Sequence, residues 1–292
     1  MNKKVNSIIF TIISFFLVQN LCFAATNPNL CPSRPYPVSN SFTRGLQTIL
    51  GLNFFAKNTA QAIIKAQLKN MAEGDFQVKV YPYSAFDLTA GKLKCFEVKA
   101  DDFSMEEIYV SHIEARSLCT FSYFDLKKNP VELLAPVYLE FKGTITQDDL
   151  NKTISSPKNK EQFSKIKVSL YNADLNLVDF YEPRIDIKNN KVYFSTKMHF
   201  SGMPKYMTIP VNVGAELVPA GNKIKMQNLE IISGSLGRAP IERLMEIISP
   251  AIFNFRELEK TGAKINLINI SVKDDKIDVR GTIWLPPVKN KF

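Results

Sequence analysis

The feature of this sequence that most constrains its fold is a change in the spacing of the apolar residues at Gly74. From Ser41 to Glu73 the apolar residues recur at helical spacing, and Gly74 is a suitable C-terminal cap for a helix. After Gly74 most segments alternate apolar and polar residues, which is the pattern of a strand with one buried face. The chain is therefore predicted to be an α+β protein with a helix over residues 41–74, broken near Gly51, and sheet and helices over residues 75–287.

The alternation is clearest in two segments. From Val137 to Ile145 one face is apolar apart from a single glycine, and the opposite face is polar. From Met207 to Leu217 apolar residues alternate over eleven positions, which is longer than most strands. Pro210 lies inside this second segment and has no N–H to donate, so we expect a sheet edge or a bulge there.

Short polar turns join two pairs of strands. The segments Ile185–Ile187 and Val192–Phe200 flank the turn 188–191, which contains two asparagines that can adopt positive φ. Near the C-terminus, Lys264–Val272 and Lys276–Leu285 flank a pair of aspartates. Both pairs are predicted to be hairpins, and the sheet is therefore predicted to be antiparallel.

Two helices are predicted to interrupt the strands. Thr146 is a good N-cap and is followed by acidic residues in the first turn, so a short helix should continue to about Ser155. The second helix should begin at Pro240, because proline is favoured at the first helical position. Its apolar stripe consists of Ile241, Leu244, Met245 and Ile248.

The first residues have the layout of a cleavable secretory signal. Lys3 and Lys4 precede an apolar run from Ile8 to Val18, which is too short to span a bilayer and ends near Ala24. We therefore expect a signal peptide over residues 1–24 and a periplasmic or cell-envelope location. A lipoprotein start at Cys22 is the alternative, and the bulky residue before this cysteine favours simple cleavage.

The remaining segments are short. Residues 25–40 are rich in proline and asparagine and are predicted to be an irregular leader, residues 41–287 a single domain, and residues 288–292 a basic tail. Cys31, Cys95 and Cys119 would remain after cleavage, with their disulfide pairing left open and one free thiol allowed.

The charge balance is basic. Loss of the two signal lysines would lower the net charge from +9 to +7. A basic exported protein can make transient contact with an anionic membrane surface, although an ordinary solvated surface has the same composition. Nucleic acid is discounted as a partner because an exported protein rarely meets it.

The sequence offers little catalytic chemistry. His112 and His199 lie in strand-like segments without a catalytic setting. The segment 233–237 resembles a nucleophile elbow around Ser235, but Ser233 stands where that motif needs glycine. We therefore predict a protein that is not an enzyme, with no catalytic residues, no metal site and no cofactor.

Several segments resemble the LmeA-like family of bacterial phospholipid-binding proteins. The most telling is the strand-to-helix step Phe141-Lys142-Gly143-Thr144-Ile145-Thr146-Gln147-Asp148-Asp149-Leu150-Asn151, which is similar to a T-x-x-D-L-N step of that family. The order of elements from Ile209 onward also follows the family, and Gly91–Leu93 and Ile108–Leu126 are more loosely similar. The resemblance covers about residues 75–286. The lysine-rich segment Pro157–Lys160 departs from it.

The resemblance implies a long curved antiparallel sheet that wraps amphipathic helices around an elongated apolar groove, similar to tubular lipid-binding domains. The ligand would be a phospholipid or another acyl lipid. The residues expected to line the groove lie on the apolar faces of three strands and on the Pro240 helix: Val137, Leu139, Phe141, Val192, Phe194, Met198, Phe200, Ile209, Val211, Val213, Leu244 and Ile248.

Two other interpretations stay open from the sequence. Apolar strand faces are usually ordinary core, and a filled core would favour a structural or protein-interaction component of the cell envelope. A lipid hydrolase that uses Ser235 ranks last.

Overall fold

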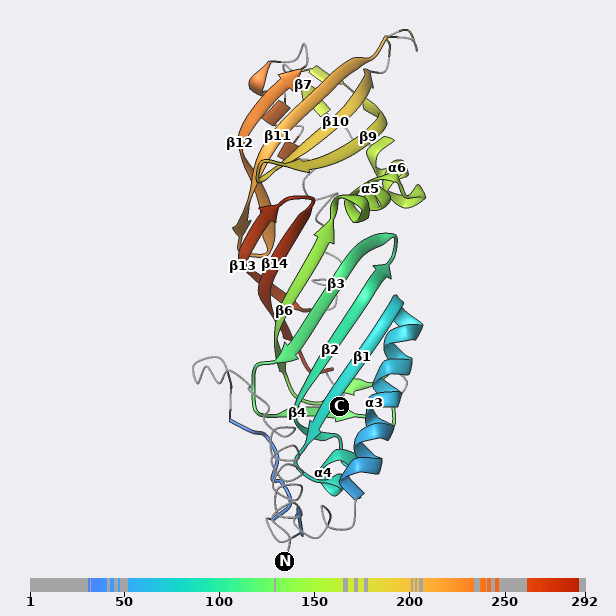
Figure 1. The fold of residues 1–292 in the computed structure, drawn as a ribbon, viewed down its shortest axis with the longest axis vertical. Helices are drawn as coiled ribbons and strands as arrows, with labels where there is room; N and C mark the ends of the chain where they lie inside the picture. The colour runs from blue at the N-terminus through green and yellow to red at the C-terminus, as the bar shows by residue number, and fades with distance from the viewer. Residues whose placement is uncertain are drawn as a thin grey trace, which may run out of the picture.

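A computed structural model gives the fold, and it shows an elongated molecule in which two antiparallel sheets follow one another along the long axis (Figure 1). The structure describes residues 31, 33–40, 43–44, 47, 52–128, 130–164, 168–170, 173–175, 178–200, 202, 204, 207–233, 237–239, 241–242, 245–246 and 262–288. The predicted signal peptide and most of the basic tail lie outside these residues.

The larger sheet contains eight of the described strands, in the order β13-β14-β6-β3-β2-β4-β5, with β1 paired to β2. The C-terminal strand β14 therefore lies between its hairpin partner β13 and the central strand β6. The strands are β1 (Glu73–Pro82), β2 (Lys92–Met105), β3 (Ile108–Ser117), β4 (Ser122–Asp125), β5 (Glu132–Leu133), β6 (Val137–Thr146), β13 (Lys264–Lys273) and β14 (Lys276–Leu285).

The smaller sheet has four described strands in the order β12-β11-β10-β9, and a two-stranded ribbon pairs β7 with β8. The family resemblance implied one long curved sheet, and this is corrected: the described strands form two main antiparallel sheets, and no strand pairing joins one to the other. The alternation predicts that a segment is a strand but not which neighbour it pairs with. The bounds are β7 (Val168–Leu170), β8 (Ala173–Leu175), β9 (Val178–Lys188), β10 (Lys191–Phe200), β11 (Ile209–Ala220) and β12 (Lys223–Ser233).

Both predicted hairpins are confirmed. Asn189 and Asn190 connect β9 to β10 with φ of 53° and 60°, as a two-residue turn of the primed type requires. Asp274, with φ of 54°, turns β13 into β14. These residues tolerate the left-handed region because their short polar side chains bond locally.

Pro210 lies near the start of β11, where it pairs with Lys197 of β10. On the other side of β11, the described register with β12 reaches only Asn212, which faces Ser233. The proline therefore lies where β11 has a described partner on one side, as its missing N–H predicts.

The predicted N-terminal helix is confirmed over part of its range as α3 (Leu52–Met71), which packs along β1 through Ala56, Ala60 and Ile64, and the predicted break near Gly51 lies outside the described residues. Its predicted cap is wrong: Gly74 lies inside β1 with φ of 142°, because the strand begins at Glu73. The short helix α4 (Ala85–Thr89) packs against the same helix near its N-terminal end (Figure 1).

The predicted helix after Thr146 is confirmed as α5 (Gln147–Ser155), followed by α6 (Pro157–Ser164). The lysine-rich segment that departs from the family therefore forms the start of α6, where the Lys158 ammonium lies 2.5 Å from the Glu106 carboxylate. In the predicted Pro240 helix, Ile241 and Met245 are helical and buried.

The predicted irregular leader is held in place by covalent and polar contacts. A disulfide joins Cys31 to Cys119 with a Cα–Cα distance of 5.5 Å, and none of the described cysteines is free. The buried Tyr36 hydroxyl donates to the carbonyl oxygens of Ser122 at 2.9 Å and Leu93 at 3.2 Å. Residues 33–40 therefore form a strap across this end of the large sheet.

Candidate functional site

Helix α5 connects the two sheets, and its first half is fixed to the large one. The Thr146 side chain caps the helix and the Asp149 carboxylate accepts from the Thr146 N–H at 2.9 Å, which completes a capping box. The same carboxylate accepts from the Ser111 N–H of β3 at 2.8 Å. One turn later, the Thr153 hydroxyl accepts from the Tyr109 N–H at 3.1 Å.

The other side of α5 is fixed to the edge of β9 in the small sheet. The Asn151 side chain accepts from the Ile185 N–H and donates to the Ile185 carbonyl, each at 2.8 Å. The Gln147 side chain accepts from the Ile187 N–H at 2.7 Å. These amides, four residues apart on one helical face, satisfy backbone groups that a neighbouring strand would otherwise pair.

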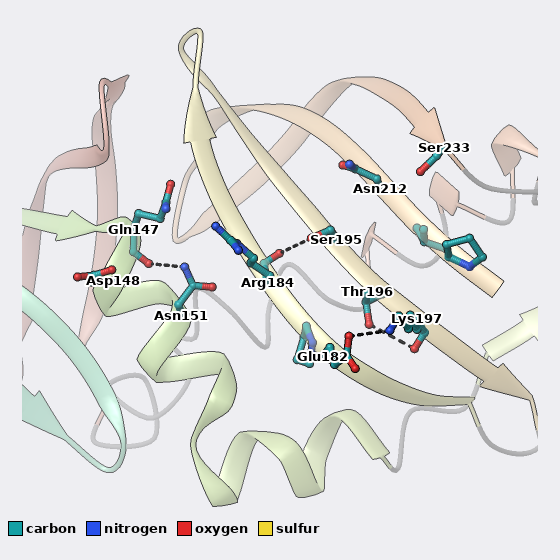
Figure 2. Close-up of a pocket in the computed structure, with 13 residues that line it drawn as sticks. Gln147, Asp148, Asn151, Glu182, Arg184, Ser195, Thr196, Lys197, Asn212 and Ser233 are labelled. Atoms are coloured by element: carbon teal, nitrogen blue, oxygen red, sulfur yellow. Dashed lines mark hydrogen bonds and ion pairs between the residues drawn. The ribbon is translucent and has the colours of Figure 1, made fainter. Parts of the chain in front are cut away.

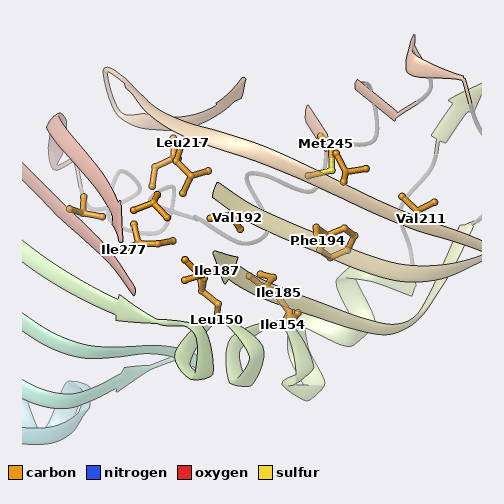
Figure 3. Packing of buried hydrophobic residues seen from close by; sticks show 14 of the residues in the cluster. Leu150, Ile154, Ile185, Ile187, Val192, Phe194, Val211, Leu217, Met245 and Ile277 are labelled. Carbon is orange, nitrogen blue, oxygen red and sulfur yellow. The ribbon is translucent and has the colours of Figure 1, made fainter. Parts of the chain in front are cut away.

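The strand-to-helix step that resembles the family is therefore a joint between the sheets. Leu150 and Ile154 lie on the third side of α5, at 2% and 0% exposure, and enter an apolar cluster shared by both sheets (Figure 3). The helix is hydrogen-bonded to β3 of the large sheet and to the edge strand β9 of the small sheet, and its apolar residues pack in the cluster between them.

The apolar cluster is the candidate lipid site, and it brings together predicted residues from three strands. Val192, Phe194 and Met198 of β10 are at most 2% exposed. Val211 and Val213 of β11 are equally buried. These five side chains are packed core, and their contact with lipid stays a prediction.

Two predicted residues lie at the border of the cluster. Phe141 of β6 and Ile209 of β11 are only partly buried, so they are better placed to meet a ligand. The other partly buried members are Ile145, Phe180, Met226, Leu229, Ile231, Ile270 and Ile283.

The remaining predicted residues lie elsewhere or are not described. Val137 and Leu139 are buried, at 1% and 7% exposure, but near the other end of β6 and outside the cluster. Leu244, Ile248 and the Phe200 side chain lie outside the described residues. The buried helical residues Ile241 and Met245 do reach the cluster, which places their helix against it.

The prediction missed 13 of the 18 described buried residues of the cluster. Ile185 and Ile187 of β9 and the apolar residues of the closing hairpin belong to it. The signal was present, because the same alternation runs through these strands, but they were treated only as hairpins. The missed buried members are Leu150, Ile154, Ile185, Ile187, Leu217, Ile224, Ile241, Met245, Ile265, Leu267, Val272, Ile277 and Val279.

A cavity of about 750 Å³ lies on the opposite, polar face of the small sheet (Figure 2). Glu182 and Lys197 pair across its floor at 2.8 Å, and Arg184 pairs with Asp186 at 3.1 Å. Because each cation already has an anion, the cavity has no excess positive charge for a lipid phosphate. It is a weaker candidate than the apolar cluster.

A buried charge cluster stabilises the centre of the large sheet. Glu140 of β6 is 5% exposed and accepts from Arg116 of β3 and Arg280 of β14, each Nε at 2.7 Å. Burial alone would raise the pKa of Glu140, but the two guanidinium groups outweigh this and hold it below its ordinary value. Three adjacent strands are thereby joined on their polar face.

The described residues contain no group of side chains arranged to hold a metal ion. Within the same part of the chain, no helix is long and apolar enough to cross a membrane. The histidines have structural surroundings: His112 Nδ1 lies 2.6 Å from Asp101, and the His199 side chain is buried against Tyr181.

Comparison with known proteins gives one match. The model of the family described as LmeA-like phospholipid-binding matches residues 48–282, which include both sheets and α5. Neither a curated protein nor a solved structure matches. The match covers most of the sequence and contains the step from β6 into α5, so the chain belongs to the LmeA-like phospholipid-binding family.

Proposed function

We propose that this protein binds one phospholipid or related acyl lipid in the apolar region between its two sheets and carries it within the cell envelope. The observation that carries the proposal is the single cluster to which both sheets, α5 and the helix around Ile241 contribute side chains. The match to a family described as phospholipid-binding supports this ligand class.

The cluster supports an elongated site because the burial of its side chains decreases from its centre to its border. Its centre is fully buried, while its border contains partly accessible apolar residues such as Phe141, Ile209 and Met226. We propose that separation of helix and sheet at this border opens a groove, with the sheets wrapped around the helix as in tubular lipid-binding domains. Methionine suits such a wall because its flexible side chain adapts to different ligand shapes.

The energetics suit a carrier. Burying one CH₂ group gains about 0.8 kcal/mol, so a chain of roughly sixteen carbons gains on the order of 12 kcal/mol over water. A bilayer offers the same chain a comparable gain. Lipid would therefore be held firmly against water and still exchange with a membrane.

An envelope location agrees with the disulfide between Cys31 and Cys119, because such bonds persist in oxidising compartments. We propose export through the signal peptide over residues 1–24. No catalytic step is proposed, and the serine once considered for hydrolysis, Ser235, lies outside the described residues.

The test is to purify the exported protein from its native envelope, extract it with solvent and identify bound lipid by mass spectrometry. A stoichiometric acyl lipid, displaced by a fluorescent fatty-acyl probe, is the expected result. Ile209→Asp should weaken probe binding because it places a charge at the border of the cluster. The matched control is Ile268→Asp, at a side chain 53% exposed and outside the cluster.

A structural or protein-interaction role is the second candidate, favoured by the close burial of Phe194 and Val213 at 1% and 0% exposure. Lipid-free protein that binds no acyl probe would select this role and reject the carrier.

A further inference from the structure

Three phenylalanines are exposed at one end of the molecule. Phe54 and Phe55 near the start of α3 are 64% and 71% exposed, and Phe86 of α4 is 63% exposed. The two rings on α3 contact each other edge to face, with centroids 5.9 Å apart. Single exposed apolar residues are ordinary, but three large rings at one end of a fold need an explanation.

Packing fixes these rings at the same end. Leu88 of α4 is buried against Ala56 and Ala60 of α3, so the short helix is held beside the first turns of the long one. Both lie at the end of the large sheet farthest from the small sheet (Figure 1). Phe86 points outward while its neighbours Ala85 and Asp87 are buried.

The charges around the rings are mainly positive. Lys57 follows Phe54 by one turn, Lys92 comes from β2 and Arg34 from the strap. Arg44 donates to the Ser39 carbonyl of the strap. Lys127 and Lys128 are exposed after β4.

Two carboxylates at this end accept hydrogen bonds within the protein. Asp87 is 4% exposed and accepts hydrogen bonds from Ser39 and Ser84, and Asp125 accepts from the Lys127 N–H. The buried Asp87 carboxylate is therefore turned away from whatever meets the surface.

We propose that this end docks on an anionic lipid bilayer, with Phe54, Phe55 and Phe86 inserted among the acyl chains and the lysines and arginines against the lipid phosphates. This combination of protruding apolar rings and a basic surround matches the interface of an anionic bilayer, which attracts cations and accepts apolar side chains a short distance deeper. The inference deepens the proposed function, on which it rests, by giving the carrier the surface through which it meets its lipid source.

The experiment measures co-sedimentation of the full mature chain with vesicles of equal parts phosphatidylglycerol and phosphatidylcholine, and with vesicles of phosphatidylcholine alone. Binding is expected to the anionic vesicles and to weaken with salt. The variant Phe54→Ser/Phe55→Ser/Phe86→Ser should lose roughly tenfold or more in vesicle affinity. Lys57→Glu/Lys127→Glu/Lys128→Glu should lose affinity for the anionic vesicles only.

The matched control alters exposed apolar residues of the small sheet and of the segment just before β11. It is Tyr181→Ser/Met207→Ser/Ile232→Ser, at side chains 46%, 49% and 48% exposed. It should bind vesicles like the unaltered chain. Insertion is read directly with Phe55→Trp after the single tryptophan is removed as Trp284→Phe. Its fluorescence should shift to the blue and be quenched by brominated lipid.

Equal loss in the control, no vesicle binding, or no quenching at position 55 would overturn the proposal. A change from dimer to monomer in the phenylalanine variant, with vesicle binding unchanged, would assign the rings to self-association instead. Bound lipid by mass spectrometry without vesicle docking would remove this inference alone. Docking without bound lipid would remove the carrier alone.

Discussion

The side-chain amide of Asn151 pairs with both backbone groups of Ile185, at 2.8 Å for each hydrogen bond, as a residue of a neighbouring strand would. Helix α5 thereby ends the small sheet at β9 while its opposite side holds β3 of the large sheet. Polar side chains on one helix therefore contribute to the relative position of the two sheets, together with the apolar cluster that both sheets share.

Replacing Asn151 with aspartate tests this joint, because aspartate keeps the shape and the acceptor but loses the donor. We expect the free energy of unfolding to fall by about 1–3 kcal/mol, since the Ile185 carbonyl loses its partner and faces a negative charge. Hydrogen exchange should show faster exchange at the Ile185 and Ile187 amides. Lys152→Ala, at an exposed position of the same helix, is the control and should leave both amides protected.

Gly281 of β14 is predicted to be intolerant of alanine. An added Cβ would lie 2.5 Å from the Asn266 carbonyl oxygen and 2.7 Å from the Phe141 ring. Gly281→Ala should cost about 1–3 kcal/mol of unfolding free energy in chemical denaturation. Gly143→Ala on the neighbouring strand, where the nearest atom is 3.8 Å away, is the control. Equal losses of unfolding free energy in the two variants would show that the Phe141 ring does not lie against Gly281.

Glu140 should make stability depend on pH in the acidic range. Its pKa is lower in the folded state than in the unfolded chain, because Arg116 and Arg280 outweigh the effect of burial. Its stabilisation is therefore present at neutral pH and lost as the pH falls below about 4. Glu140→Gln should lower the unfolding free energy at pH 7 by about 2 kcal/mol, with the deficit shrinking in acid.

Urea denaturation across this pH range measures the effect of Glu140. The control is Glu114→Gln, which removes a more accessible partner of Lys99 on the same face and should cost about 0.5 kcal/mol. A deficit for Glu140→Gln that stays constant with pH would contradict the assigned ionisation.

The disulfide should contribute to stability by restricting the unfolded chain. It closes a loop over a sequence separation of 88, for which chain entropy predicts about 4 kcal/mol. Cys31→Ser/Cys119→Ser should lower the melting temperature and make the strap over residues 33–40 sensitive to protease. Ser33→Ala, an exposed change in the same strap, should do neither. Unchanged proteolysis would mean that the hydrogen bonds of Tyr36 and Ser39 hold the strap without the disulfide.

Local features were predictable from the sequence, because each depends on neighbouring residues. Asn189 and Asn190 adopt the positive φ that the hairpin needs, and Thr146 caps α5 as its hydroxyl and the following acids indicate. The antiparallel, β-rich character followed from the alternation.

Features that depend on distant residues were not predictable. Alternation places Glu140 on a polar face but cannot show that Arg116 and Arg280 flank it, because register between separate strands is set by the whole fold. For the same reason the division into two sheets was missed. The candidate lipid residues were predicted on three strands and the Pro240 helix only, since the alternation at Ile185 or Ile277 indicates a buried face but not which cluster that face joins.

The position of β14 has a consequence for how the chain is made. The Thr144 hydroxyl on β6 donates to Asp278, a residue 134 positions later, so β6 has an open edge until the last strand has been synthesised. Pairings at such separation form slowly, and an open edge invites association with other chains. A ribosome that stalls before the closing hairpin would leave a fragment prone to aggregation, so a chaperone that binds open strands is expected to matter most for truncated products.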